Sequence, residues 1–136
     1  MVSARSKARK AAFDVLYSAE QRGQDLSVAL SDYESRETAK REPLTELGFV
    51  VLLVNGVNDN LVEIDRVLST NLTDWTLARL FAVDRAILRL ATWELLYSET
   101  PADAVRAEAL ALADEYGSDD AARFIGGVVG AITRAR

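Results

Sequence analysis

Residues 83–97 have the sequence VDRAILRLATWELLY. Four apolar side chains in this segment recur at positions i, i+3, i+4 and i+8, which places them on one face of a helix: Ile87, Leu90, Ala91 and Leu95. No glycine or proline interrupts the pattern. The segment therefore predicts a core helix of about four turns.

The same period predicts helices toward the N-terminus. A first helix covers residues 4–22, ends at Gly23, and buries a row formed by Ala8, Ala12, Val15, Leu16 and Ala19. Asp25 is the expected N-cap of a short second helix, and the polar residues 34–42 are expected to form an exposed connection. A long third helix is expected to have Pro43 in its first turn and to continue to Leu68.

Toward the C-terminus, residues 70–80 are expected to be a linker with one helical turn near Leu77. Pro101 begins a helix that ends at Gly117, and Ser118 is the expected cap of a last helix with Phe124, Val128 and Ile132 on its inner face. Asp119 and Asp120 are interpreted as helix-capping charges in its first turn, since neighbouring carboxylates on a helix do not converge on a metal ion. The predicted fold is all-α: a compact bundle of six or seven helices in one domain, residues 1–136.

Composition narrows the possible functions. The 136 residues include no histidine and no cysteine, which excludes imidazole bases, thiolate nucleophiles and Cys/His zinc sites. No apolar run approaches the roughly 20 residues of a membrane span, and no secretory signal is evident, so we expect a cytoplasmic protein without membrane contact. We expect no enzymatic activity and no cofactor, because no catalytic constellation stands out.

Charge is unevenly distributed along the chain. The net charge is −5, yet residues 1–22 carry five basic and two acidic side chains. Arg5, Arg9, Phe13 and Tyr17 lie on one row of the first helix, with Lys10 beside it and Lys7 farther round. Basic groups between aromatic rings are typical of single-stranded RNA recognition, because they bind phosphates while the rings stack on bases. The alternative is a solvated helix end with two rings at the edge of the core.

Two further patterns leave alternatives open. Asp84, Arg85 and Arg89 lie beside Trp93, a combination that suits either a protein partner or a core helix with surface charges. Gly126, Gly127 and Gly130 lack the spacing of a phosphate loop and are interpreted as sites of close helix packing. Of these, we expect Gly127 to be the packed position and Gly126 to tolerate a side chain.

Three segments in the same order resemble one family. Residues 83–89 (VDRAILR) followed by Trp93-Glu94-Leu95 closely resemble the central signature of the bacterial transcription antitermination factor NusB family. Residues 4–9 (ARSKAR) with Leu16-Tyr17 resemble the arginine-rich first helix of that family, and residues 124–129 (FIGGVV) resemble its ending. The resemblance covers essentially the whole chain.

The resemblance implies two packed helical subdomains and a role in binding rather than catalysis. NusB-like proteins bind the boxA element of nascent RNA together with NusE, a ribosomal small-subunit protein, in an antitermination complex on RNA polymerase during ribosomal RNA synthesis. The residues expected at the RNA are Arg5, Lys7, Arg9, Lys10, Phe13, Tyr17, Asp120, Arg123 and Phe124. Those expected at NusE are Asp84 and Arg85.

Two other functions compete with this one. NusB-like domains also precede ribosomal RNA cytosine methyltransferases, but 136 residues leave no room for a methyl-donor domain. The second alternative is a NusB-like protein-interaction or dimerisation module, such as a homodimer, that binds RNA weakly. Gly126 in place of the family's asparagine and Asp114 in place of a usual lysine favour it, because they remove donors and positive charge from the expected RNA surface.

Overall fold

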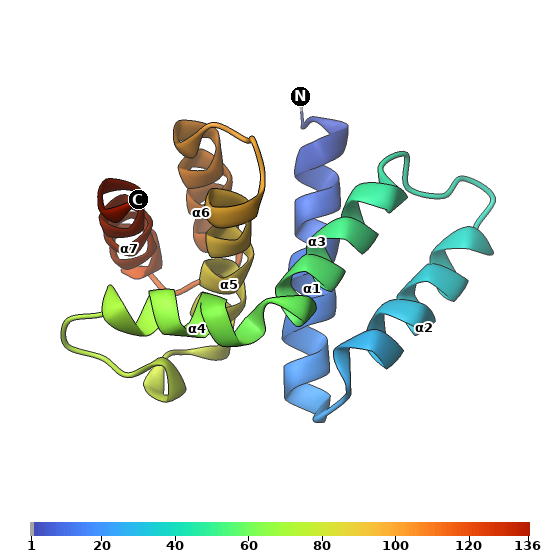
Figure 1. Ribbon diagram of the computed structural model, residues 1–136. Coiled ribbons are helices and arrows are strands. Elements are labelled where there is room, and N and C mark those ends of the chain that lie inside the picture. Colours follow the sequence, from blue (N-terminus) through green and yellow to red (C-terminus); the bar gives the residue numbers. More distant parts are fainter. Residues whose placement is uncertain (1) are drawn as a thin grey trace. The chain divides into compact units, whose positions relative to one another are not determined.

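The computed structural model describes residues 2–136, and every regular element among them is a helix (Figure 1). The chain divides into two compact units, the first extending to Asp59 and the second covering Asn60–Arg136. The all-α class, the number of helices and the division into two helical subdomains are thereby confirmed.

The first unit contains α1 (Ala4–Arg22), α2 (Leu26–Thr38) and α3 (Leu47–Asp59). Local capping explains three of its boundaries. Ser3 Oγ accepts a hydrogen bond from the Ser6 N–H at 3.0 Å, and Gly23 ends α1 with a φ of 60°, a left-handed conformation that glycine adopts without strain. Asp25 accepts from the N–H groups of Ser27 and Val28, as the sequence predicted.

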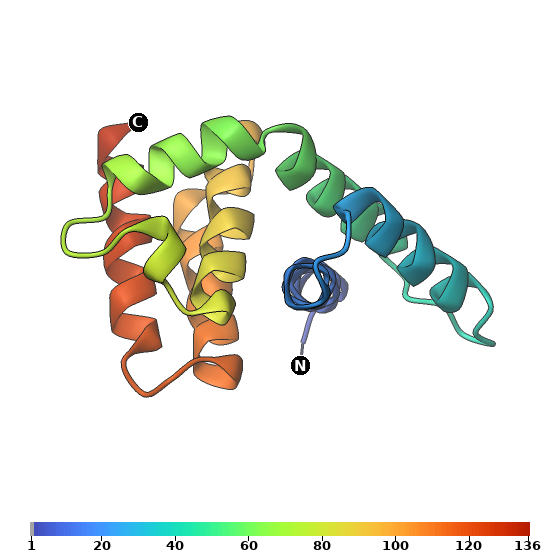
Figure 2. The ribbon, with the colours of Figure 1, turned by 90° about the horizontal axis from the view of Figure 1, so that it is seen from below.

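Each of the three helices contacts the other two, and α2 and α3 run side by side across α1 (Figure 2). The predicted inner row of α1 is buried throughout, from Ala8 to Ala19. In α3 the buried apolar residues include Val50, Leu53 and Val57, none of which is measurably exposed. Burial of these side chains at roughly 1.5–3 kcal/mol each stabilises the unit.

The segment after α2 differs from the prediction. Residues 34–38 still belong to α2, and Glu37 is buried instead of exposed. Its carboxylate accepts hydrogen bonds from Lys40 Nζ at 2.8 Å and from the Leu44 N–H at 2.7 Å. Glu37 thus fixes the connection to α3, a role that polarity alone did not reveal.

The second unit contains α4 (Leu61–Thr70), the 3₁₀ turn η1 (Leu77–Arg79), α5 (Ala82–Tyr97), α6 (Ala102–Tyr116) and α7 (Ala121–Ala135). Helices α5, α6 and α7 lie side by side, and α4 lies across them (Figures 1 and 2). Helices α5 and α7 each contact the other three α-helices of this unit. Trp93 is buried in the core, and Arg89 forms a bidentate ion pair with Asp65 of α4 at 2.9 and 3.0 Å.

The single long third helix was a wrong prediction. The chain instead forms α3 and α4, with a non-helical Asn60 (φ −119°, ψ 21°) between them. Asn58, Asp59 and Asn60 are weak helix formers whose short polar side chains favour helix ends, so the sequence held a signal that the continuous apolar period concealed. Helix α3 also begins at Leu47, four residues after Pro43.

The start of α7 was also predicted wrongly. Ser118 does not cap this helix, because Asp119 and Asp120 form a turn and α7 begins at Ala121. Asp120 occupies the N-cap position without a side-chain hydrogen bond. Val128 and Ile132 are buried as expected, whereas Phe124 is only half-buried.

Within residues 2–136, no single helix is long and apolar enough to cross a membrane. In this described part of the chain, one consecutive pair, α3 and α4, reaches that length and hydropathy when taken together, but it is interrupted at Asn60.

Candidate nucleic-acid and partner interfaces

In the first half of α1, three basic side chains are exposed: Arg5, Lys7 and Lys10. The Arg5 guanidinium carbon lies 4.0 Å from the centre of the Phe49 ring, and its Nε is 3.6 Å from a carboxylate oxygen of Glu46. These contacts orient Arg5 while leaving 56% of its side chain exposed. The three residues form a positively charged surface on the first half of α1, called here the α1 basic surface.

Two other members of the predicted RNA row are not available at this surface. Phe13 is 2% exposed, so its ring is closed to a stacking base, and the structure contradicts the accessibility that this role requires. Arg9 is 8% exposed, with its guanidinium carbon 5.2 Å from the Phe49 ring centre. The half-buried Tyr17 stacks on Phe13, with ring centroids 6.0 Å apart. The row was misjudged because it borders the apolar face of α1 that the rest of the unit covers.

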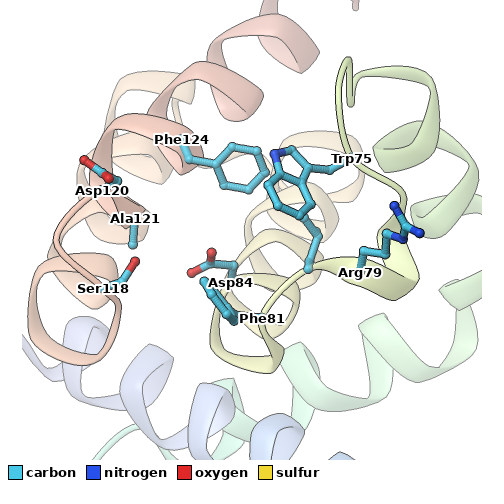
Figure 3. A pocket seen from close by; sticks show the side chains of 9 residues that line it. Trp75, Arg79, Phe81, Asp84, Ser118, Asp120, Ala121 and Phe124 are labelled. Atoms are coloured by element: carbon cyan, nitrogen blue, oxygen red, sulfur yellow. The ribbon is translucent and has the colours of Figure 1, made fainter.

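In the second unit, a pocket of about 430 Å³ lies between the N-terminal ends of α5 and α7. It brings together three predicted site residues, Asp84, Asp120 and Phe124. Figure 3 shows the Phe124 ring and the Trp75 indole on the same side of this pocket, with the Asp84 carboxylate directed into it. We call it the α5–α7 pocket.

The rim of the α5–α7 pocket includes two aromatic residues that were not predicted. Phe81 is 71% exposed and Trp75 is 55% exposed. Large exposed aromatic side chains are enriched in the centres of protein interfaces. The available signal was their position: Trp75 lies in the predicted linker and Phe81 directly follows it, so both are large apolar residues outside any predicted helix.

Asp84 is the chemically unusual group in this pocket. It is 6% exposed, and its Oδ1 atom has no hydrogen-bond partner within the part of the chain that the structure describes. Burial raises the pKa of this carboxyl above its ordinary value of 3.8. A buried acceptor without a donor carries a free-energy cost that an incoming N–H group would remove. The pocket is therefore suited to a donor or cation that enters between aromatic rings.

Arg85 is used within the unit itself. Its Nη1 donates to the carbonyl oxygens of Leu77 and Leu80 at 3.1 and 2.9 Å. Because Leu80 lines the α5–α7 pocket, this contact holds one wall of the pocket in place. Arg85 and its neighbour Asp84 thus differ in surroundings, although both were predicted as partner contacts.

Arg123 does not line the α5–α7 pocket with Phe124. It borders a separate groove of about 590 Å³ between α6 and α7. The expected roles of two glycines in this groove are reversed. A Cβ atom on Gly127 would meet no atom within 4 Å, whereas one on Gly126 would lie 3.0 Å from Arg106 Nη2 and 3.2 Å from Leu110 Cδ2. Gly126 is the packed position, and it faces α6.

The observations define a class: an all-α protein of two helical units, with a basic helix face and an aromatic-rimmed pocket around a buried carboxylate. Comparison with known protein families identifies which family has these features. The sequence model of the NusB family matches residues 6–134 of this chain. The chain belongs to the NusB family.

Individual relatives cover nearly the full length. The transcription antitermination protein NusB of Nocardioides sp. is 42% identical over 98% of this chain and 96% of the relative, and that of Staphylococcus aureus strain MRSA252 is 39% identical over 96% and 98%. Among solved structures, T. maritima NusB has a TM-score of 0.85 at 31% identity, covering 98% of this chain and 93% of that chain. A chain in the crystal structure of antitermination factors NusB and NusE in complex with dsRNA has a TM-score of 0.85 at 28% identity and full coverage of both chains.

Proposed function

We propose that this chain is a transcription antitermination factor that binds boxA-type single-stranded RNA together with NusE, in an antitermination complex on RNA polymerase. The observation that carries the proposal is its full-length likeness to the chain in the structure of NusB and NusE with dsRNA. Relatives named as transcription antitermination proteins support the same function. The two units then serve as one NusB-like RNA-binding domain over residues 1–136, which acts by binding rather than as an enzyme, in the bacterial cytoplasm where transcription takes place.

The proposed RNA contacts come from both units. In the first unit, Arg5, Lys7 and Lys10 neutralise phosphates, and Tyr17 offers its half-buried ring to a base. In the second unit, Arg123 supplies a further cation. Phe124 and Asp120, at the α5–α7 pocket, supply a ring and an acceptor for base edges.

The part of the α5–α7 pocket formed by Trp75, Phe81 and Asp84 is the proposed NusE contact, and it adjoins the part assigned to RNA. The Asp84 carboxylate would receive an N–H donor of the partner, and Phe81 and Trp75 would supply apolar contact area around it. Binding would provide the partner that Asp84 Oδ1 lacks within the described residues. Arg85 contributes by holding the pocket wall at Leu80.

A titration of labelled boxA RNA, with and without NusE and at two salt concentrations, tests the function. We expect NusE to raise the RNA affinity. The triple variant Arg5→Gln, Lys7→Gln, Lys10→Gln should reduce the log–log salt slope by about 2, since each lost phosphate contact on a single strand accounts for roughly 0.7. The control variant Arg22→Gln, Arg36→Gln, Arg41→Gln changes the net charge equally at exposed arginines elsewhere. No RNA binding at low salt, with or without NusE, would overturn the proposal.

The exposed aromatic rim favours a second candidate, a protein-interaction or dimerisation module with weak RNA binding. Phe81 and Trp75 present apolar surface, while the net charge of −5 opposes polyanion binding. In the same titration this candidate predicts NusE binding or self-association with no gain in RNA affinity.

A further inference from the structure

The groove between α6 and α7 is lined by three arginines and three glycines: Arg106, Arg123, Arg134, Gly126, Gly127 and Gly130. All three arginines are exposed, and none of their guanidinium groups has a hydrogen bond or ion pair to another residue of the described range 2–136. Asp103 is the one carboxylate among the residues that line it. The groove is therefore locally positive on a chain whose net charge is negative.

Helical spacing explains why these residues share one groove. On α7, positions 123, 127, 130 and 134 follow each other at intervals of four, three and four, which places them on one face. Arg106 comes from the first half of α6, where its Nη2 atom lies 3.0 Å from the place that a Cβ atom on Gly126 would occupy. Arg134 Nη1 lies 3.1 Å from the corresponding place at Gly130. The absent side chains thus leave room for guanidinium groups against the helix backbone.

The chemistry of the lining favours phosphates over a protein partner. A guanidinium group presents its N–H donors in a planar fork that matches phosphate oxygens. Among residues 2–136, no aromatic or large aliphatic side chain lines the groove, so these residues offer neither an anchor for a protein interface nor a platform for a base. A ligand held by these groups would be recognised through its backbone, without preference for base sequence.

We propose that the α6–α7 groove binds the phosphodiester backbone of single-stranded RNA that extends beyond the boxA element. This inference rests on the proposed function, because Arg123 in the groove directly precedes Phe124, which is proposed to contact RNA at the α5–α7 pocket. RNA leaving that pocket has the groove as its nearest positive surface on α7. Arg123 to Arg134 spans about 16 Å along the helix, which is long enough to engage more than one phosphate.

The test compares a boxA oligonucleotide, the same oligonucleotide extended by uridines on both sides, and one extended by adenosines. The two extended RNAs should bind the wild-type chain equally and more tightly than the short one. Arg106 and Arg134 are the two groove arginines that boxA RNA does not already use, so two further neutralised phosphates would add about 1.4 to the salt slope, an extra loss of roughly sevenfold between 50 and 200 mM salt. Arg106→Gln with Arg134→Gln should remove that extra loss and leave the affinity for the short RNA unchanged.

Two controls complete the design. Arg36→Gln with Arg41→Gln changes the net charge equally outside the groove and should not affect the gain from extension. Gly127→Glu and Gly127→Gln place side chains of equal size where the space is open. Only the Glu variant should abolish the increase in RNA affinity that extension produces.

The outcomes separate this inference from the proposed function. If the short boxA RNA binds but extension adds nothing, the groove proposal is overturned and the proposed function stands. If extended RNA binds equally well without boxA and the short RNA does not bind, the proposed function fails while the groove proposal stands. Competition by a poly-glutamate peptide as strong as that by uridine RNA would show a site for acidic peptides and overturn the groove proposal.

Discussion

Asp84 combines an energetic cost in the folded chain with a proposed role in NusE binding at the α5–α7 pocket. Its pKa is higher in the folded chain than its ordinary value of 3.8, so between those two values the folded state binds more protons than the unfolded state. Its contribution to stability therefore falls as the pH rises through this window. Its place in the first turn of α5 favours the charge, but desolvation outweighs that effect.

Asp84→Asn removes the charge and keeps the shape. At pH 7 we expect the variant to be more stable than the wild type, because a neutral amide costs less to bury than a carboxylate. The difference should shrink toward pH 4 in denaturant unfolding, and NusE should bind the variant more weakly. If the stability of the variant minus that of the wild type is smaller at pH 7 than at pH 4, this account is contradicted.

The two adjacent glycines of α7 should respond differently to alanine. Gly127→Ala gains helix propensity in open space and should stabilise by about 1 kcal/mol. Gly126→Ala should be close to neutral, because the same gain is offset when Arg106 and Leu110 shift by a few tenths of an ångström. Unfolding midpoints of the two variants measure which is the more stable. A destabilised Gly127→Ala protein would show an unrecognised contact at position 127.

At the scale of elements, Glu37 connects the end of α2 to the segment before α3. The Lys40 ammonium, and then the Leu44 N–H, hold the pKa of this carboxyl below its ordinary value of 4.5 against the opposing effect of burial. The stabilisation is present above pH 4.5 and is lost as the pH falls through the lower, folded-state value. Glu37→Gln should be less stable at pH 7 and should lose less stability between pH 5 and 3. Glu42→Gln, at an exposed position of the same connection, should follow the wild-type profile.

The connection between α6 and α7 depends on Gly117. A Cβ atom there would lie 2.5 Å from Ala121 Cβ and 2.8 Å from the Ala113 carbonyl oxygen, and a backbone atom cannot move aside as a flexible side chain does. We expect Gly117→Ala to destabilise by about 1–3 kcal/mol. Gly23→Ala is the comparison: its space is open, and the left-handed φ of 60° alone should cost about 1–2 kcal/mol. Equal stability of Gly117→Ala and wild type in urea unfolding would refute the packing argument.

For the whole molecule, the absence of histidine predicts that RNA binding depends little on pH. Ordinary lysine, arginine and carboxylate groups keep their charge between pH 6 and 7, and the chain has no imidazole. The affinity for boxA RNA without NusE should therefore change less than about twofold over this range, at constant salt. A larger change would show that a carboxyl with a raised pKa, such as Asp84, takes part in RNA binding.

Features set by neighbouring residues were predictable. The limits of α1 follow from Ser3 and Gly23, and the start of α2 follows from Asp25. The accessibility of site residues was not predictable, because it depends on residues distant in sequence. Arg9 and Phe13 share a helical row with exposed Arg5, yet both are buried. The helix break at Asn60 was only partly predictable. The asparagines at positions 58 and 60 indicate a helix end, but the apolar residues keep a helical period across the break.

The amino-acid sequence by itself determined the helical class, the limits of α1, α5 and α6, the exclusion of imidazole and thiolate chemistry, and the family resemblance, because each depends on local spacing and residue type. Only the tertiary structure decided that Asp84 Oδ1 lacks a partner and that Arg85 bonds to the carbonyls of Leu77 and Leu80. Likewise, only helix packing turned Gly126 toward α6 and gathered three arginines in one groove. These properties depend on which helices lie together, since burial and hydrogen bonding are set by atoms that the sequence places far apart.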